Sequence, residues 1–215
     1  MARWGMPSPV FALAGKKTDF GVANIRNVKS PHWRHWLGVE SRCVVPFSSF
    51  SEYEVQADGS RVPAWFALDD SRPFAVFAGI WTRWTSVRKV KEGETTNNLF
   101  GFLTTEPNAE VAPIHAKAMP VILRTPEEID VWLTAPPPDA LALQKPLPDG
   151  SLRGRGAGQQ GGWEGNGRTI QAGVRSTRGM NTWTLLVEPL PRVAAATMES
   201  RDFDASAAPA IHSKP

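Results

Sequence analysis

Short apolar runs separated by turn-forming residues dominate the pattern between residues 42 and 123. The runs are rich in β-branched and aromatic residues, which are typical of strands, and the stretches between them hold Asp, Gly, Ser and Pro. We therefore expect an antiparallel β domain in which the polar stretch 86–98 is one of the turns. The expected strands are 43–46, 62–68, 74–81, 98–105 and 119–123.

Two segments carry the signals that open helices. Ser30 is a good N-cap residue followed by a proline, so we expect a helix from there to about Gly38. Thr125 repeats this arrangement and adds two early glutamates, and three prolines from position 136 predict the end of that helix. A mainly antiparallel sheet with a few short helices is an α+β fold.

The composition fits one folded domain followed by a tail. The 215 residues are 41% hydrophobic with 9 Trp and 10 Phe, which is enough for a packed core. Half of the 18 glycines lie between residues 154 and 179 among polar residues without apolar periodicity. We therefore predict a domain over 1–150 and a flexible tail over 151–215, in which only 181–190 has the pattern of a strand.

Hydropathy and cysteine content indicate the compartment of the protein, and the charge indicates how it could bind nucleic acid. No apolar run approaches the ~20 residues of a membrane-spanning helix, and a single cysteine excludes an intrachain disulfide, so we expect a protein of the cytoplasm. We also expect a monomer. Residues 1–150 carry 16 Lys+Arg and 16 Asp+Glu, so the net charge of +3 comes entirely from the residues that follow. Binding of nucleic acid must therefore depend on particular residues rather than on bulk charge.

Glu52 and His115 are the candidates for acid/base chemistry. Glu52 directly follows an apolar run and has Phe50 and Tyr53 as neighbours, so partial desolvation should raise its pKa. His115 lies in a short connection between two expected strands, where its ring can change charge near neutral pH. Taken singly, a solvated acid and a structural histidine are the alternative readings.

Asn24, Arg26 and Trp4 are candidates for contacts with DNA. Asn24 and Arg26 alternate along a possible extended segment, where an amide and a guanidinium on one face could orient a sugar and hold a phosphate. Trp4 could stack on a base or pack in the core. Neither the remaining histidines nor Cys43 has neighbours at metal-ligand spacing, so we expect no metal and no cofactor, and a structural role for Cys43.

Taken together, these elements resemble the SOS response-associated peptidase (SRAP) family of abasic-site processing proteins. Each motif is weak alone, but the ordered series over residues 3–150 is specific. The landmarks are R-W-G at 3–5, N-I-R at 24–26, the C-x-x-P-x-x-x-F-x-E element at 43–52, F-A-G-I-W at 77–81, T-T-E-P-N at 104–108, I-H-x-x-x-M-P-V-I-L at 114–123 and W-L at 132–133.

The resemblance implies a barrel-like, mainly antiparallel sheet and a partner, single-stranded DNA that contains abasic sites. It implies the hydrolase and lyase chemistry of a peptidase family that crosslinks to such sites through a cysteine at position 2. By the same resemblance, Glu52, His115 and Asn24 would be catalytic. Arg26, with Trp4 and Arg3, would contact DNA.

The chain departs from the family at the nucleophile. The family begins Met-Cys-Gly-Arg well before R-W-G, whereas this chain has Ala2 directly before that motif. We therefore expect the segment with the crosslinking cysteine to be absent, either through a shortened gene model or in a degenerate relative. A non-catalytic module that binds single-stranded DNA and a nonfunctional fragment are the alternative functions.

Overall fold

The computed structural model describes residues 2–155, 169–170 and 184–186. This part of the chain is α+β, with few helices and mostly antiparallel sheets, as the pattern predicts. The strands are β1 (Ala2–Trp4), β2 (Asn24–Ile25), β3 (Arg42–Phe47), β4 (Ser49–Val55), β5 (Arg61–Ala67), β6 (Ala75–Val87), β7 (Glu94–Thr105), β8 (Met119–Pro120), β9 (Ile122–Leu123), β10 (Arg153–Arg155), β11 (Thr169–Ile170) and β12 (Thr184–Leu186). The helices are α1 (Val10–Leu13), α2 (Pro126–Thr134) and α3 (Pro137–Leu141), with 3₁₀ turns at Arg34–Trp36, Val39–Ser41 and Val90–Glu92.

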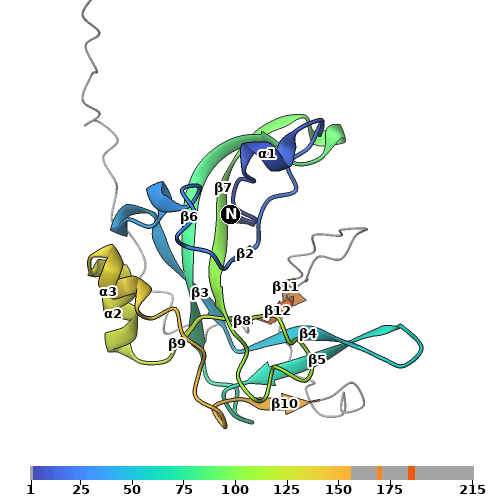
Figure 1. Ribbon diagram of the computed structural model, residues 1–215, viewed down its shortest axis with the longest axis vertical. Coiled ribbons are helices and arrows are strands. Elements are labelled where there is room, and N and C mark those ends of the chain that lie inside the picture. The colour runs from blue at the N-terminus through green and yellow to red at the C-terminus, as the bar shows by residue number, and fades with distance from the viewer. Residues whose placement is uncertain (1, 156–168, 171–183, 187–215) are drawn as a thin grey trace, which may run out of the picture.

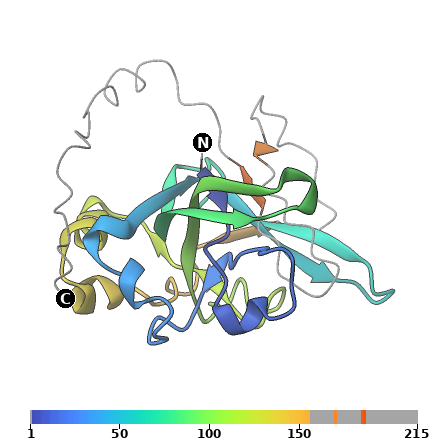
Figure 2. The same cartoon turned by 90° about the horizontal axis from the view of Figure 1, so that it is seen from above.

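The strands form two open sheets, so the predicted barrel-like closure is not confirmed. One sheet has seven strands built around the order β1-β7-β6-β3, and the other has the order β10-β5-β4-β12-β11. Figure 1 shows the long β6–β7 hairpin running upright while the β4–β5 hairpin projects across its lower end. Figure 2 shows α2 and α3 on the side of the molecule away from the tip of the β4–β5 hairpin.

Strand β7 gathers the segments that carry the sequence motifs on its two edges. The strands β1 and β2 pair with it in parallel at residues 98–100 and 102–103, and β8 pairs with residues 104–105 in the antiparallel direction. β6 pairs with residues 94–102 on the edge opposite β1 and β2. Val121 continues that edge, because its N–H donates to the Leu103 carbonyl at 2.9 Å and its carbonyl accepts from the Ala78 amide of β6 at 3.0 Å. Segments that are far apart in the sequence therefore lie next to one another along a single strand.

A column of aromatic rings joins the two sheets. Phe66 of β5 stacks on Phe50 of β4 at 5.4 Å between centroids, and Phe50 meets Phe77 of β6 at 5.8 Å. Phe77 packs on Phe102 at 4.9 Å, and Phe102 stacks on Trp4 at 5.3 Å. Burial of each such ring stabilises the fold by roughly 1.5–3 kcal/mol, so this column fixes how the sheets cross.

The opposite face of the larger sheet packs on α2. Trp132 of α2 is fully buried there with Ile80 and Leu103, and its Nε1–H donates to the carbonyl of Cys43 at 2.8 Å. The start of α2 confirms the predicted cap, because Thr125 Oγ1 accepts a hydrogen bond from the Glu128 amide at 3.2 Å. The prolines after it end α2 as predicted and also open α3.

Two local predictions were wrong. The segment 30–38 forms turns and a 3₁₀ turn in place of an α-helix, with Trp36 N–H donating to the Trp33 carbonyl at 2.9 Å. A 3₁₀ turn brings residues i and i+3 to one side, and this places both tryptophans in the core. The stretch 86–98 is mostly strand, because β6 and β7 continue to Val87 and Glu94 as a polar ribbon without apolar alternation.

Some of the chain beyond residue 150 joins the smaller sheet. β10 pairs with β5, and β12, which lies within the predicted strand 181–190, pairs with β4. The rest of the predicted tail, residues 156–168, 171–183 and 187–215, lies outside the described residues. The domain boundary near residue 150 stays a prediction.

Candidate active site

Glu52 lies in the middle of β4, between the two sheets. It pairs in register with Ala64 of β5, and only 2% of its surface is exposed. Alternation along the strand places it on the same side as Phe50, which belongs to the aromatic column. Burial raises the pKa of Glu52, and a hydrogen bond from His115 opposes this only in part. Glu52 is thus a buried acid within a strand, and it does not stand at a solvated strand end.

His115 contacts this carboxylate from the loop 106–118. Its Nδ1 lies 2.9 Å from Glu52 Oε1 and 2.8 Å from the Ala118 carbonyl oxygen. A carbonyl oxygen can only accept, so Nδ1 carries the hydrogen that is donated to Ala118, and Glu52 Oε1 lies beside this N–H. The ring is then the tautomer in which Nε2 is the nitrogen that gains or loses a proton.

Short hydrogen bonds hold the loop that carries His115. The Asn108 side chain accepts from the Val111 amide and donates to Glu110 at 2.7 Å. Glu110 also accepts from the Gly150 amide at 2.7 Å, and Asp149 accepts from the Ala109 amide at 2.9 Å. The segment 149–150 therefore fixes the start of the loop and, through it, the position of the imidazole.

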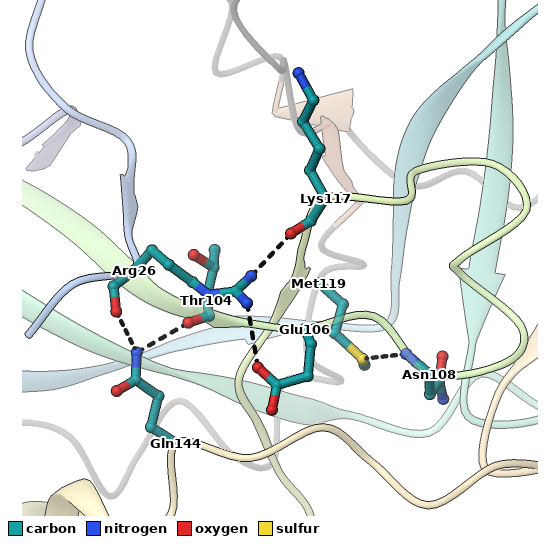
Figure 3. Close-up of polar contacts among 7 residues, drawn as sticks. All are labelled: Arg26, Thr104, Glu106, Asn108, Lys117, Met119 and Gln144. Atoms are coloured by element: carbon teal, nitrogen blue, oxygen red, sulfur yellow. Dashed lines mark hydrogen bonds and ion pairs between the residues drawn. The ribbon is translucent and has the colours of Figure 1, made fainter.

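Arg26 is tied to the same loop. Its Nη1 donates to the Lys117 carbonyl at 2.8 Å, and its Nη2 lies 3.2 Å from Glu106 Oε2, as Figure 3 shows. The Gln144 amide nitrogen donates to the carbonyls of Arg26 and Thr104 at 2.8 and 2.9 Å. Gln144 therefore connects the end of β2 to the end of β7.

Asn24 opens β2 opposite Phe102 of β7, two residues before Arg26. Its side chain is half-buried, and its Oδ1 has no hydrogen-bond partner within the described part of the chain. A buried amide oxygen without a partner is costly, so such a group calls for an explanation, such as an ordered water or a role in catalysis. The structure thus brings Glu52 and His115 into direct contact, and it ties Arg26 to the loop of His115.

Comparison with known proteins shows the family of the chain. The sequence model of the family "SOS response associated peptidase (SRAP)" matches residues 1–156. The chain belongs to the SRAP family.

The similar curated proteins are all described as abasic site processing proteins. YoqW of Bacillus subtilis (strain 168) is 33% identical over 150 residues, which cover 67% of this chain and 61% of YoqW. YobE of the same organism is 30% identical over 148 residues, or 67% of this chain and 63% of YobE. YoaM is 31% identical over 134 residues, or 61% and 54%. The SRAP chain described here thus matches between 54% and 63% of the length of these relatives.

In this SRAP chain, Arg3 and Trp4 of the R-W-G motif both contact other parts of the protein. Trp4 is 6% exposed and stacks on Phe102, so its ring serves the core, which was the alternative reading of the sequence. Arg3 Nη1 lies 3.0 Å from Glu92 Oε2. Contact of either residue with DNA stays a prediction.

Cys43 is a poor nucleophile in this SRAP chain. Burial raises the pKa of its thiol to about 12, so it is protonated at neutral pH. Its Sγ packs closely over Gly79, where an added Cβ would lie 2.9 Å from the sulfur. This environment supports the structural role predicted for Cys43.

The described residues include no group of three or more His, Cys, Asp or Glu side chains placed to hold a metal ion. Within the same residues, no helix has the length and apolar character needed to cross a membrane.

Sequence reasoning did not single out three residues that the structure places around Arg26, namely Glu106, Lys117 and Gln144. Glu106 and Lys117 lie within the motifs 104–108 and 114–123, so the motifs themselves were a signal. Gln144 follows α3 outside any motif, and only the tertiary structure reveals its two hydrogen bonds.

Proposed function

We propose that this SRAP protein binds single-stranded DNA and opens the deoxyribose ring of abasic sites, with His115 and Glu52 moving the proton. The observation that carries the proposal is the direct contact of the buried Glu52 carboxyl with the His115 ring, at 2.9 Å. The family and the names of the relatives supply the substrate class.

Ring opening moves one proton. An abasic deoxyribose is a cyclic hemiacetal, so its C1 hydroxyl loses a proton, the bond between C1 and the ring oxygen breaks, and the ring oxygen gains a proton. Nε2 of neutral His115 can take the first proton, and the resulting imidazolium can return it to the ring oxygen. The proton count is unchanged, and the product is the open-chain aldehyde.

Glu52 supports this transfer from behind the ring. A carboxylate next to Nδ1–H stabilises the imidazolium while it exists, and a buried site strengthens that attraction. The Ala118 carbonyl, which also faces Nδ1, holds the ring in the tautomer in which Nε2 is the nitrogen without a hydrogen. Asn24, whose Oδ1 has no partner in the described part of the chain, would accept a hydrogen bond from the sugar.

Arg26 would bind a phosphate next to the abasic sugar. Its guanidinium is 47% exposed and is fixed to the His115 loop through the Lys117 carbonyl. A phosphate on Arg26 would therefore hold the sugar in register with the imidazole. Cys43 has no part in this proposal, because a buried thiol with a pKa of about 12 cannot supply the crosslinking thiolate.

The test measures the open aldehyde. Methoxyamine captures only the open form, so a protein that opens the ring should accelerate capture of a labelled abasic oligonucleotide. We expect the wild-type chain to accelerate the capture. Glu52→Gln and His115→Gln should lower the rate of capture by about 10²-fold or more, which is the usual contribution of a general acid or base. Both variants should still bind the oligonucleotide, whereas Arg26→Ala should weaken binding equally for all sequences.

Binding without any acceleration by the wild-type chain would overturn the catalytic proposal and leave a non-catalytic DNA-binding module. A denaturing gel of the same mixtures should show no heat-stable protein-DNA adduct. An adduct that disappears in Cys43→Ser would contradict the structural role of that thiol.

A further inference from the structure

The guanidinium of Arg26 is already occupied by a carboxylate in the absence of DNA. Figure 3 shows Glu106, directly after β7, turned toward Nη2 of Arg26, while Nη1 donates to the Lys117 carbonyl. The distance from Nη2 to Glu106 Oε2 is 3.2 Å. A carboxylate in this position resembles a phosphate in both its charge and its oxygen geometry.

A phosphate that grips both outer nitrogens of Arg26 competes with Glu106 for their N–H groups. The best grip of arginine on phosphate is bidentate, with two parallel N–H bonds to two oxygens. Both outer nitrogens of Arg26 already donate, one to Lys117 and one to Glu106. Lys117 contributes a backbone carbonyl that the loop fixes, so Glu106 is the partner that can leave.

Glu106 is suited to leave because it is on the surface. Its side chain is 65% exposed and that of Arg26 is 47% exposed, and exposed ion pairs hold their partners weakly. Hydrogen bonds from its own backbone amide and from Thr105, with the charge of Arg26, hold the pKa of Glu106 below its usual range. Glu106 is therefore a carboxylate at any pH at which the protein would meet DNA.

We propose that Glu106 competes with DNA phosphates for Arg26 and so sets the affinity of this site for the DNA backbone. The proposal rests on the proposed function only in that Arg26 is the phosphate ligand. DNA binding then becomes an exchange in which one anion replaces another. It follows that Arg26 contributes less to affinity in the wild-type protein than an unpaired arginine would.

The exchange predicts how the affinity for DNA depends on salt concentration. A new phosphate contact with a single strand releases condensed counterions and adds about 0.7 to the slope of log K against log [salt]. When Glu106 must give up Arg26, its released carboxylate attracts cations again, and this offsets the gain. Removing the charge of Glu106 should therefore strengthen binding and steepen its salt dependence.

The experiment measures fluorescence anisotropy of a labelled oligo-dT without abasic sites, titrated with the full chain at several salt concentrations. We expect Glu106→Gln to bind about two- to fivefold more tightly at low salt, the range set by exposed ion pairs, with a slope steeper by about 0.7. Asp130→Asn on α2 is the matched control, because it removes one exposed acid elsewhere on the surface. It should leave both quantities unchanged.

The double variant Arg26→Ala/Glu106→Gln separates competition from a general field. If Glu106 acts through Arg26, the double variant binds like Arg26→Ala, and the two effects are not additive. Equal tightening by Glu106→Gln in both backgrounds would overturn the competition. If Arg26→Ala binds like the wild type even in the Glu106→Gln background, Arg26 is no phosphate ligand, and that part of the proposed function fails instead.

Discussion

Glu52 Oε1 and His115 Nδ1 lie 2.9 Å apart, although β5, β6 and β7 separate the two residues in the chain. The carboxylate comes from the smaller sheet, and the imidazole comes from a loop that leaves the larger sheet. Their contact therefore depends on the aromatic column that sets one sheet across the other. It also places an imidazole against a carboxyl whose pKa is raised by burial.

The raised pKa of Glu52 predicts a pH-dependent cost to stability. A carboxyl whose pKa is higher in the folded state stabilises the fold below its unfolded pKa of about 4.3, and this contribution is lost as pH rises through the folded pKa. Glu52→Gln, which cannot ionise, should therefore gain stability relative to wild type with rising pH, by up to about 1.4 kcal/mol per pH unit between the two pKa values.

Thermal or urea unfolding of both proteins at pH 5 and pH 8 measures this difference. Glu54→Gln on the same strand is the control, because Glu54 is less buried, and its difference from wild type should stay constant. A wild-type protein that gains stability over Glu52→Gln as pH rises would contradict the raised pKa of Glu52, because the attraction of His115 would then outweigh burial.

Cys43 should be almost inert in the folded protein. With a pKa of about 12, only about one thiol in ten thousand is ionised at pH 8, and the thiolate is the reactive form. A chromogenic disulfide reagent should label the native chain slowly and the urea-unfolded chain within the mixing time. Rapid labelling of the native chain, absent from Cys43→Ser, would contradict the assigned burial.

Arg42 should be important for stability, although it takes no part in the proposed function. It is 4% exposed, and it donates to the Leu37 carbonyl at 2.9 Å and to the Trp132 and Ala135 carbonyls at 2.9 and 2.7 Å. The last two carbonyls belong to the C-terminal end of α2, which a cation stabilises. Arg42→Met should cost about 2–4 kcal/mol of unfolding free energy, because it leaves these buried carbonyls without a donor.

Urea unfolding followed by tryptophan fluorescence measures this loss. Arg42→Lys keeps the charge but cannot make three directed hydrogen bonds, so its stability should fall between those of the other two proteins. An Arg42→Met variant as stable as wild type would mean that water replaces the guanidinium at the end of α2.

Gln144 should affect DNA binding without touching DNA. Its amide nitrogen donates to the carbonyls of both Arg26 and Thr104, and so fixes the end of β2 that carries Arg26. Gln144→Glu has the same shape but cannot donate, and it should lower stability by about 1 kcal/mol and weaken binding of oligo-dT severalfold. Gln144→Ala, which adds no charge, should show a smaller loss of binding. Unchanged binding in both variants would show that Arg26 does not need this support.

The local pattern of the sequence determined several of the strands and the helix α2, and it singled out the candidate site residues, but it did not predict β4, the strand in which Glu52 lies. Thr125, a proline and two glutamates suffice to open α2, because a cap acts within one turn. The strands β3, β5, β6 and β7 were predictable because their apolar runs are bounded by turn residues. The short span 30–38 was not predictable as a 3₁₀ turn, since the burial of Trp33 and Trp36 decides its geometry.

Only the tertiary structure decided which of these residues meet. The sequence could propose Glu52 and His115, but their contact comes from two sheets packed through Phe50 and Phe77, and no local rule contains that crossing. The sequence likewise left open whether Trp4 stacks on a base or packs in the core, and its contact with Phe102 in the aromatic column decides for the core. Pairing across long loops depends on the sum of many weak packing terms, so the partner of Arg26, Glu106, became visible only once β2 and β7 lay side by side.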